Sequence, residues 1–391
     1  MLQSFFVYTF FALAMYIAAS SAMRVPVNNT SGNRKGLLYY FPMGYIVCVL
    51  LFFLISGFRY NVGVDHLGYL SEYLDALRGV YYERDRGYEI GFKYTTVLFG
   101  NLGIHPIIYF GFLGSIQLLF VMLAYRKERS IMPYMMLLLL LGGYFFTWMN
   151  GIRQLVAACI FVFSIQYIKD RSLWKFLICI LLAATWHKSV IIMVPFYLLT
   201  YDKTIWNKKW ILLGVIVACF VIGNTPTWVS NISQMGLIMD FMGYDFYADR
   251  IDEFMDESSF TSFNFGPRML LILVTYILIV YLYPKTRSCF QDSNIDISFK
   301  LCFLGICGYY LFVNTTMNFL RPFLYFTIFA LPLSAYTLVY LIKKKKTLLL
   351  VIFLVATMTN TYLSCLSDAR APITERKSYL YHFYFDNVKT W

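Results

Sequence analysis

Long apolar stretches recur from one end of the chain to the other, and they constrain its fold more than any other feature. They lie near residues 2–22, 37–57, 105–125, 131–149, 152–168, 174–200, 210–226, 267–284, 299–316, 320–342 and 347–365. A helix of about 20 apolar residues crosses the hydrocarbon core of a bilayer. A helix also satisfies its own backbone hydrogen bonds in lipid, and the alternation typical of barrel strands is absent here. The sequence therefore predicts an all-α polytopic membrane protein.

The composition of the 391-residue chain excludes the other broad classes. Apolar residues make up 59% and charged residues only 14%, against about 25% charged in an average soluble domain. These proportions exclude a soluble enzyme, a disordered chain and a disulfide-rich secreted module. The eight cysteines lie mostly inside apolar stretches without CxxC spacing, so we read them as core residues. The net charge of +12 suits cytoplasmic loops and does not imply binding to nucleic acid.

The distribution of lysine and arginine sets the orientation, because short cytoplasmic loops are enriched in both. One set of loops holds 19 basic residues beside five acidic residues: Arg24, Arg34, Lys35, Arg126, Lys127, Arg129, Lys169, Arg171, Lys175, Lys203, Lys208, Lys209, Lys285, Arg287, Lys300 and Lys343 to Lys346. We assign this set to the cytoplasm. The first 22 residues resemble a signal peptide but lack a basic residue before the apolar run, so we expect a retained helix with its N-terminus outside.

This orientation requires the stretch 174–200 to turn back on itself, since both of its ends are basic. Two arms of about 13 residues are each about 20 Å long as α-helices, shorter than a bilayer core of about 30 Å. The turn falls near Trp186 to Ser189. The alternative is one tilted helix. With the hairpin, we expect about 12 membrane helices in one domain, residues 1–365, with outer loops at 58–104 and 227–266. Residues 366–391 form an aromatic-rich tail on the same outer side.

Ionisable residues in or beside the apolar stretches are the candidate site residues, since burying charge in a membrane is costly. The orientation places six of them at the outer face: Arg59, Asp65, Arg153, His187, Arg268 and Arg321. Arginines stay charged and bind phosphate oxygens bidentately, so this set predicts a site for a diphosphate-linked lipid. They would neutralise the pyrophosphate as it leaves. His187 is a candidate base for an attacking hydroxyl, and Asp65 competes for that role.

Further outer-face residues form a candidate substrate-binding set: Tyr69, Glu89, Gln154, Tyr325 and Lys188. The tyrosines, with Tyr60 and Tyr88, suit stacking on sugar faces, although aromatics make up 20% of this chain and often serve only packing.

Each candidate also has a structural interpretation. An arginine at a helix mouth can anchor the helix on lipid phosphate, His187 can be a satisfied core histidine, and Asp65 can pair with Arg59. The acidic run at 240–257 suits a solvated face. No P-loop, GxGxxG, HExxH or GxSxG motif is present, and the first outer segment has no paired-Asp motif of metal-dependent glycosyltransferases.

Four segments, in order, resemble the EpsG family of Wzy-like polysaccharide polymerases. They are Gly57-Phe58-Arg59-Tyr60-Asn61-Val62-Gly63-Val64-Asp65 with Tyr69, Asn150-Gly151-Ile152-Arg153-Gln154-Leu155-Val156-Ala157, Ala183-Ala184-Thr185-Trp186-His187-Lys188-Ser189, and Asn318-Phe319-Leu320-Arg321 with Tyr325. The resemblance covers about residues 40–340. The family typically reads Asp-Tyr where this chain has Asp65-His66, so we do not carry a site residue over to His66.

The resemblance implies a bacterial inner-membrane protein that joins repeat units carried on undecaprenyl diphosphate at the periplasmic face. It implies neither a metal nor a nucleotide cofactor, and the expected fold is similar to GT-C-like glycosyltransferases and O-antigen ligases. A chain-length regulator is a further expected partner. Three rival functions are another polyprenyl-lipid glycosyltransferase, a transporter or flippase of lipid-linked oligosaccharides, and a membrane acyltransferase. The charges cluster at one face, which disfavours a transporter, and the acyltransferase would place His187 on the cytoplasmic side.

Overall fold

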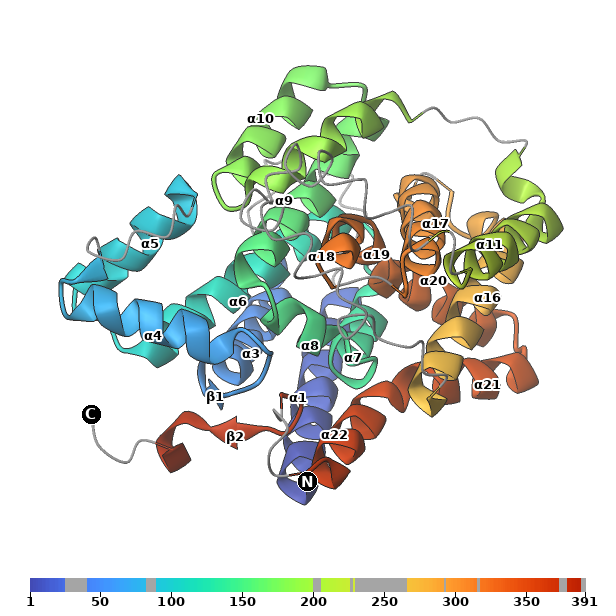
Figure 1. Cartoon of the computed structure of the whole chain (residues 1–391). Helices are drawn as coiled ribbons and strands as arrows, with labels where there is room; N and C mark the ends of the chain where they lie inside the picture. The colour runs from blue at the N-terminus through green and yellow to red at the C-terminus, as the bar shows by residue number, and fades with distance from the viewer. Residues whose placement is uncertain are drawn as a thin grey trace.

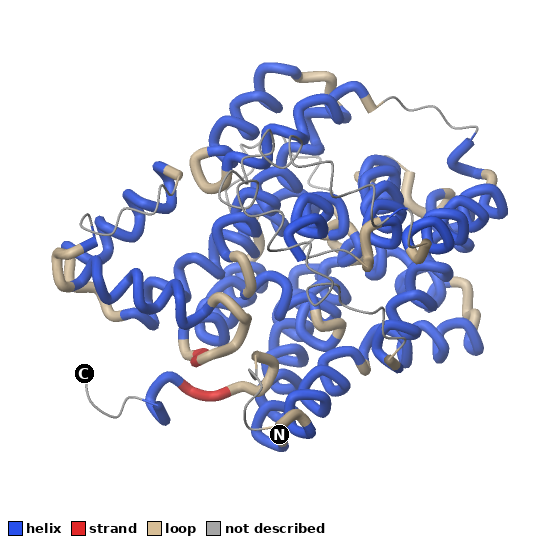
Figure 2. Tube along the Cα trace, viewed as in Figure 1, coloured by secondary structure: helices blue, strands red, loops and turns tan. Residues whose placement is uncertain are grey.

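The computed structural model describes residues 1–24, 41–81, 89–199, 205–225, 228, 266–291, 293–314, 317–372 and 378–387. In these residues the chain is a bundle of helices with one short two-stranded sheet (Figures 1 and 2). The acidic run at 240–257 and Tyr88 lie outside the described residues.

Six helical segments of the described chain are long and apolar enough to cross a membrane. They are Leu2–Ser21 (α1), Pro106–Tyr125 (α6), Ile152–Lys169 (α9), Pro267–Arg287 (α16), Arg321–Lys343 and Thr347–Arg370. Shorter apolar helices are Met43–Gly57 (α3), Met132–Leu141 (α7), Leu173–Ala184 (α10), Lys188–Leu198 (η3) and Lys209–Gly223 (α11). The helical fold with several helices able to cross a membrane is thereby confirmed, and the number of about twelve spans and the similarity to GT-C-like glycosyltransferases stay predictions.

Several apolar stretches are broken where their sequence interrupts a helix. The stretch 131–149 divides into α7 and Tyr144–Met149 (α8), because Gly143 adopts the left-handed conformation (φ 77°) that ends helices. The stretch 320–342 begins as Met317–Leu320 (α18), tightens into the 3₁₀ turn Arg321–Phe323 (η7), and continues as Leu324–Thr327 (α19) and Ala330–Lys343 (α20). The last stretch divides into Thr347–Met358 (α21) and Asn360–Arg370 (α22). Such breaks at membrane depth are tolerated where protein encloses them.

The stretch 174–200 is a hairpin, as its two basic ends require. Helix α10 ends at Ala184, the chain reverses through Thr185 to His187, and η3 packs back against α10. The rings of Phe176 and Tyr197, near the two bases of the hairpin, lie 5.3 Å apart. The second arm is a 3₁₀-helix rather than the expected α-helix. Pro195 lies inside it, and proline has no N–H for the helical ladder.

The outer segment 58–104 holds two helices that the sequence analysis treated as loop, His66–Leu77 (α4) and Ile90–Asn101 (α5). They project to one side of the bundle (Figure 1). Gly100 of α5 packs so closely on α4 that an added Cβ would lie 2.8 Å from the Ala76 methyl group. The opposite face of α5 exposes apolar side chains four residues apart: Ile90, Tyr94, Leu98 and Leu102 just beyond its end. This stripe suits contact with lipid.

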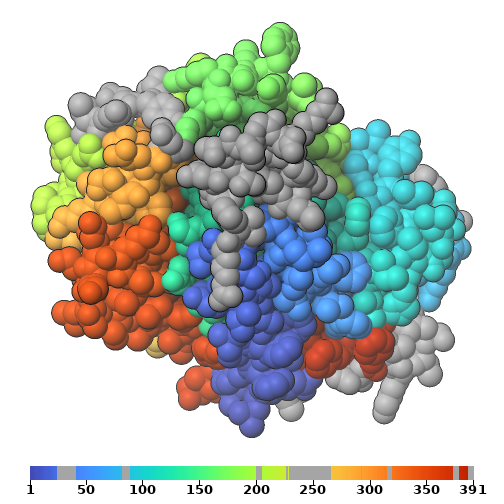
Figure 3. Space-filling view, turned by 180° about the vertical axis from the view of Figure 1, so that it is seen from behind, coloured from blue at the N-terminus to red at the C-terminus, as the bar shows by residue number. Residues whose placement is uncertain are grey.

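Contacts between distant segments join those helix ends that the charge pattern assigns to the outer side. Strand Arg59–Tyr60 (β1) pairs with strand His382–Phe383 (β2) of the tail, and the Tyr381 N–H donates to Ser4 Oγ (2.9 Å). The last described residues accordingly lie beside the N-terminal ones in the view from behind (Figure 3). At the opposite end, Glu128 Oε1 accepts from the Asn294 N–H (2.9 Å), which joins two loops assigned to the cytoplasm.

Candidate active site

The turn that follows α3 packs against the start of α9. Gly63 adopts φ 89°, and an added Cβ would lie 2.5 Å from the Met149 carbonyl oxygen, so a larger residue does not fit there. Asp65 Oδ2 accepts from the Gly151 N–H (3.2 Å), and the Asp65 N–H donates to Asn150 Oδ1 (3.2 Å). Gly151 is the N-cap residue of α9. Asp65 therefore holds the first turn of the helix that carries Arg153.

Arg59 lies inside this turn and not with the other arginines. It is 1% exposed, and its Nη1 donates to the Val62 carbonyl and lies 2.8 Å from His66 Nδ1. The guanidinium carbon sits 5.4 Å from the centre of the Phe110 ring. These contacts tie the turn to α6 and give Arg59 a place in the framework beneath the site.

Arg153 is joined to the hairpin through Glu89. Its Nη1 lies 2.6 Å from Glu89 Oε2, and the other carboxylate oxygen accepts from the backbone N–H of Lys188 (3.1 Å). A hydrogen bond also links Arg153 to Tyr69 of α4. Glu89 is the N-cap residue of α5, so one carboxylate links α5, α9 and η3.

The hairpin turn places His187 beside α19. His187 is 8% exposed, and its Nδ1 lies 2.8 Å from Ser189 Oγ, which is 2.9 Å from the Tyr325 hydroxyl. The turn is fixed on its other side by α5, where the Gly91 N–H donates to the Thr185 carbonyl (2.7 Å). A chain of hydrogen bonds thus orients the imidazole ring from two separate elements.

Arg321 completes the group. Gln154 Nε2 donates to the Arg321 carbonyl (2.8 Å), which connects α9 to η7. The charged side chains acting on His187 are Glu89, Arg153, Arg321 and Lys188. We call these five residues the ionic cluster: Glu89, Arg153, His187, Lys188 and Arg321. Among the described residues it contains three cationic side chains and one carboxylate, a composition that favours an anionic ligand.

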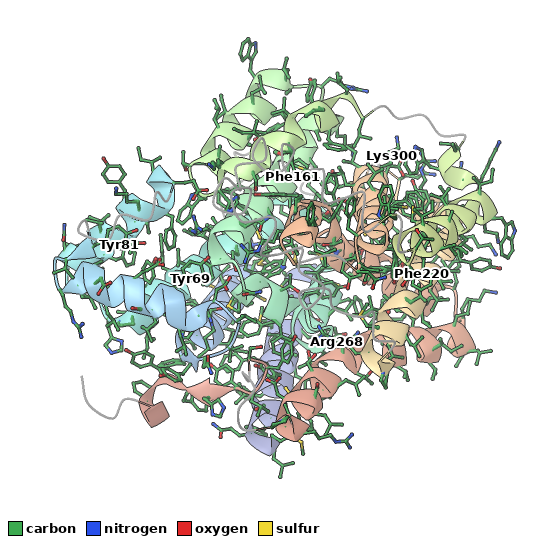
Figure 4. All side chains as sticks on the ribbon, viewed as in Figure 1. Tyr69, Tyr81, Phe161, Phe220, Arg268 and Lys300 are labelled. Atoms are coloured by element: carbon green, nitrogen blue, oxygen red, sulfur yellow. The ribbon has the colours of Figure 1, made fainter. Side chains whose placement is uncertain are left out.

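Arg268 lies apart from the ionic cluster, at the start of α16, and points toward the middle of the bundle (Figure 4). Its Nη1 lies 3.4 Å from the hydroxyl of Tyr379, and the guanidinium carbon is 5.4 Å from the centre of that ring. Arg268 lines a cavity of about 120 Å³. Leu155 and Leu324 also line it, and their chain neighbours Gln154 and Tyr325 contact the cluster.

The structure therefore brings together most of the sequence-predicted residues. Arg153, Arg321, His187, Lys188, Glu89, Gln154, Tyr69 and Tyr325 form one connected network, and Asp65 supports it from below. The sequence analysis missed Ser189 as a link and Asn360 in the cavity wall. The polar run Thr359-Asn360-Thr361 inside an apolar stretch was the available signal for Asn360. Across the described residues, no cluster of three His, Cys, Asp or Glu side chains suits a metal ion.

Comparison with known proteins identifies one similarity. The sequence model of the EpsG family matches residues 43–381. No curated protein and no solved structure matches the chain.

Proposed function

The chain belongs to the EpsG family, which comprises Wzy-like polymerases and related membrane glycosyltransferases, and we propose that it polymerises polysaccharide repeat units. In this proposal a growing glycan leaves undecaprenyl diphosphate and joins a sugar hydroxyl of an incoming lipid-linked unit at the periplasmic face of the inner membrane. The observation that carries the proposal is the ionic cluster. In it, Arg153 at the start of α9 and Arg321 in the interrupted stretch 320–342 lie near His187.

The charge of the cluster suits the donor substrate. A diphosphate that bridges a lipid and a sugar carries about two negative charges, and the cationic side chains of the cluster suit its oxygens. Arg153 and Arg321 would bind its oxygens and stabilise the charge that develops as the bond between anomeric carbon and phosphate oxygen breaks. Lys188 is the first residue of η3, and its ammonium group would add to this stabilisation.

His187 is the proposed proton acceptor. The acceptor hydroxyl oxygen attacks the anomeric carbon, its proton passes to the imidazole, and undecaprenyl diphosphate leaves. In the tautomer whose Nδ1–H donates to Ser189, Nε2 carries the lone pair that takes this proton. Asp65 is less suited to the role, because one of its carboxylate oxygens already accepts from the Gly151 N–H just before α9.

Deletion of the gene tests the function directly. We expect surface polysaccharide to collapse to single repeat units on the lipid carrier, and a plasmid copy to restore the long chains. A strain that keeps its full-length polysaccharide after the deletion would contradict the proposal. Accumulation of units on the cytoplasmic side alone would instead indicate a flippase.

A further inference from the structure

The cavity beside Arg268 lies where three apolar stretches are broken. Its wall includes Gly143 between α7 and α8, Thr327 at the end of α19, and Asn360 at the start of α22. A volume of about 120 Å³ holds several water molecules, and so a group of the size of a phosphate or part of a sugar. Interruptions of three separate apolar stretches therefore meet at this cavity.

Two polar atoms of opposite character have no partner in this wall. Asn360 is 5% exposed, and its Nδ2 donates to the carbonyls of Ala356 (2.9 Å) and Thr357 (3.0 Å), while its buried Oδ1 has no hydrogen-bond partner among the described residues. The Nε–H of Arg268 is a buried donor that likewise has no hydrogen-bond partner among the described residues. Buried polar groups are rarely left unsatisfied, and doing so costs free energy.

The remaining wall favours a hydroxylated ligand. The hydroxyls of Thr275 and Thr357 donate to carbonyls of their own helices (2.9 and 2.7 Å), which leaves their oxygens able to accept a hydrogen bond. A phosphate esterified on both sides has no O–H group and only accepts hydrogen bonds, so it would satisfy Arg268 but not Asn360. A sugar hydroxyl both donates and accepts, and a neighbouring phosphate matches the charge of Arg268.

We propose that this cavity binds the sugar–phosphate end of the second lipid-linked substrate, the acceptor unit, while the ionic cluster holds the donor diphosphate. This inference rests on the proposed function, because a polymerase of this kind must hold two lipid-linked glycans at once. The position agrees with the assignment, since Leu155 and Leu324 line the cavity and their chain neighbours Gln154 and Tyr325 belong to the hydrogen-bonded network of the cluster.

Native mass spectrometry of the full-length protein in nanodiscs tests the proposal, with the lipid-linked repeat unit as the probe. A His187→Ala background prevents joining of the bound units. We expect this background protein to take up two lipid-linked units, and the added change Asn360→Ala or Arg268→Gln to leave one, with at least tenfold weaker binding of the second. Asn294→Ala, a buried asparagine at the opposite end, and Arg287→Gln, at the other end of α16, are the matched controls and should keep both units.

The outcomes separate this inference from the function on which it rests. Two units bound by every variant would overturn the cavity assignment and leave the polymerase intact. A single unit bound by the background protein would also overturn it. No unit bound by any form would contradict the proposed function and the inference together.

Discussion

The ion pair between Arg153 and Glu89 permits a test that separates phosphate binding from structural support. Arg153→Gln removes the guanidinium, Glu89→Gln removes the carboxylate, and the double variant removes both charges. If Arg153 exists to bind Glu89, losing both partners should cost little more than losing one, because no charge is left unpaired. If Arg153 exists to bind substrate, both variants that lack it should be inactive and Glu89→Gln should retain activity.

The structure sets the expected magnitudes. The two side chains are 19% and 12% exposed and approach to 2.6 Å, so this pair lies between the surface and buried limits. Glu89→Gln keeps an oxygen that can accept from the Lys188 N–H and loses one charged hydrogen bond, which costs about 1.5–3 kcal/mol of unfolding free energy. Arg153→Gln should lower the rate of chain extension by about 10²–10³-fold, the effect of removing one group that stabilises developing charge.

Two measurements on the same variants decide between the roles. Thermal unfolding in detergent reports the stability of each protein, and gel ladders of the polysaccharide from a complemented deletion strain report chain extension. We expect Glu89→Gln to be less stable but to make long chains, and Arg153→Gln to lose the long chains both alone and together with Glu89→Gln. Recovery of long chains in the double variant would refute phosphate binding by Arg153 and make it a structural residue.

The candidate base, the membrane topology and the buried carboxyl of Glu128 can each be tested separately. His187→Ala should slow extension by about 10²–10⁴-fold while single lipid-linked units accumulate, whereas an inactive Asp65→Asn with a functional His187→Ala would make Asp65 the base. For the topology, an impermeant thiol reagent applied from outside should label cysteines at the exposed positions 67, 101 and 385 but not at 127, 205 and 344, and labelling at 205 would contradict the hairpin. Burial raises the pKa of the Glu128 carboxyl to about 8. The hydrogen bond from the Asn294 N–H and the charge of Lys169 lower this pKa, but by less than burial raises it. The folded state therefore binds the extra proton between about pH 4.5 and 8, and the unfolding free energy should fall as the pH rises through this window, a slope that Glu128→Gln should remove. Equal slopes in thermal unfolding of both proteins would contradict this.

The hairpin was predictable because it follows from a constraint that acts on the whole segment. Basic residues at both ends require an even number of crossings, whatever the local helix type. The 3₁₀ form of the second arm depends on Pro195 and on packing against α10, which the charge pattern does not report. The helix breaks at Gly143 and Asn360 lie within stretches that the sequence analysis took as continuous, although a glycine pair and a short polar run mark them.

The sequence of the outer segment 58–104 contains a helical pattern that the sequence analysis did not use. Apolar and buried residues of α4 recur at helical spacing, at His66, Tyr69, Leu70, Tyr73 and Ala76. The spacing predicts an amphipathic helix where a loop was expected. The pairing of β1 with β2 has no such signal, because each strand is two residues long and more than 300 residues separate them.

The site itself was predictable as a set of residues but not as a network. Costly charges at helix ends identified Arg153, His187 and Arg321, since the membrane makes such positions exceptional. The same argument placed Arg59 with them, although its guanidinium supports a turn beneath the site. Only the three-dimensional structure separates a charge that faces the cluster from one that braces it.

Reconstitution of the purified protein in liposomes with a lipid-linked repeat unit, and no nucleotide sugar, tests the central claim most directly. The account predicts a ladder of longer lipid-linked glycans and the release of one undecaprenyl diphosphate for each bond formed, with the ladder absent for His187→Ala. Movement of the lipid-linked unit across the bilayer without extension, or extension only when a nucleotide sugar is added, would contradict it.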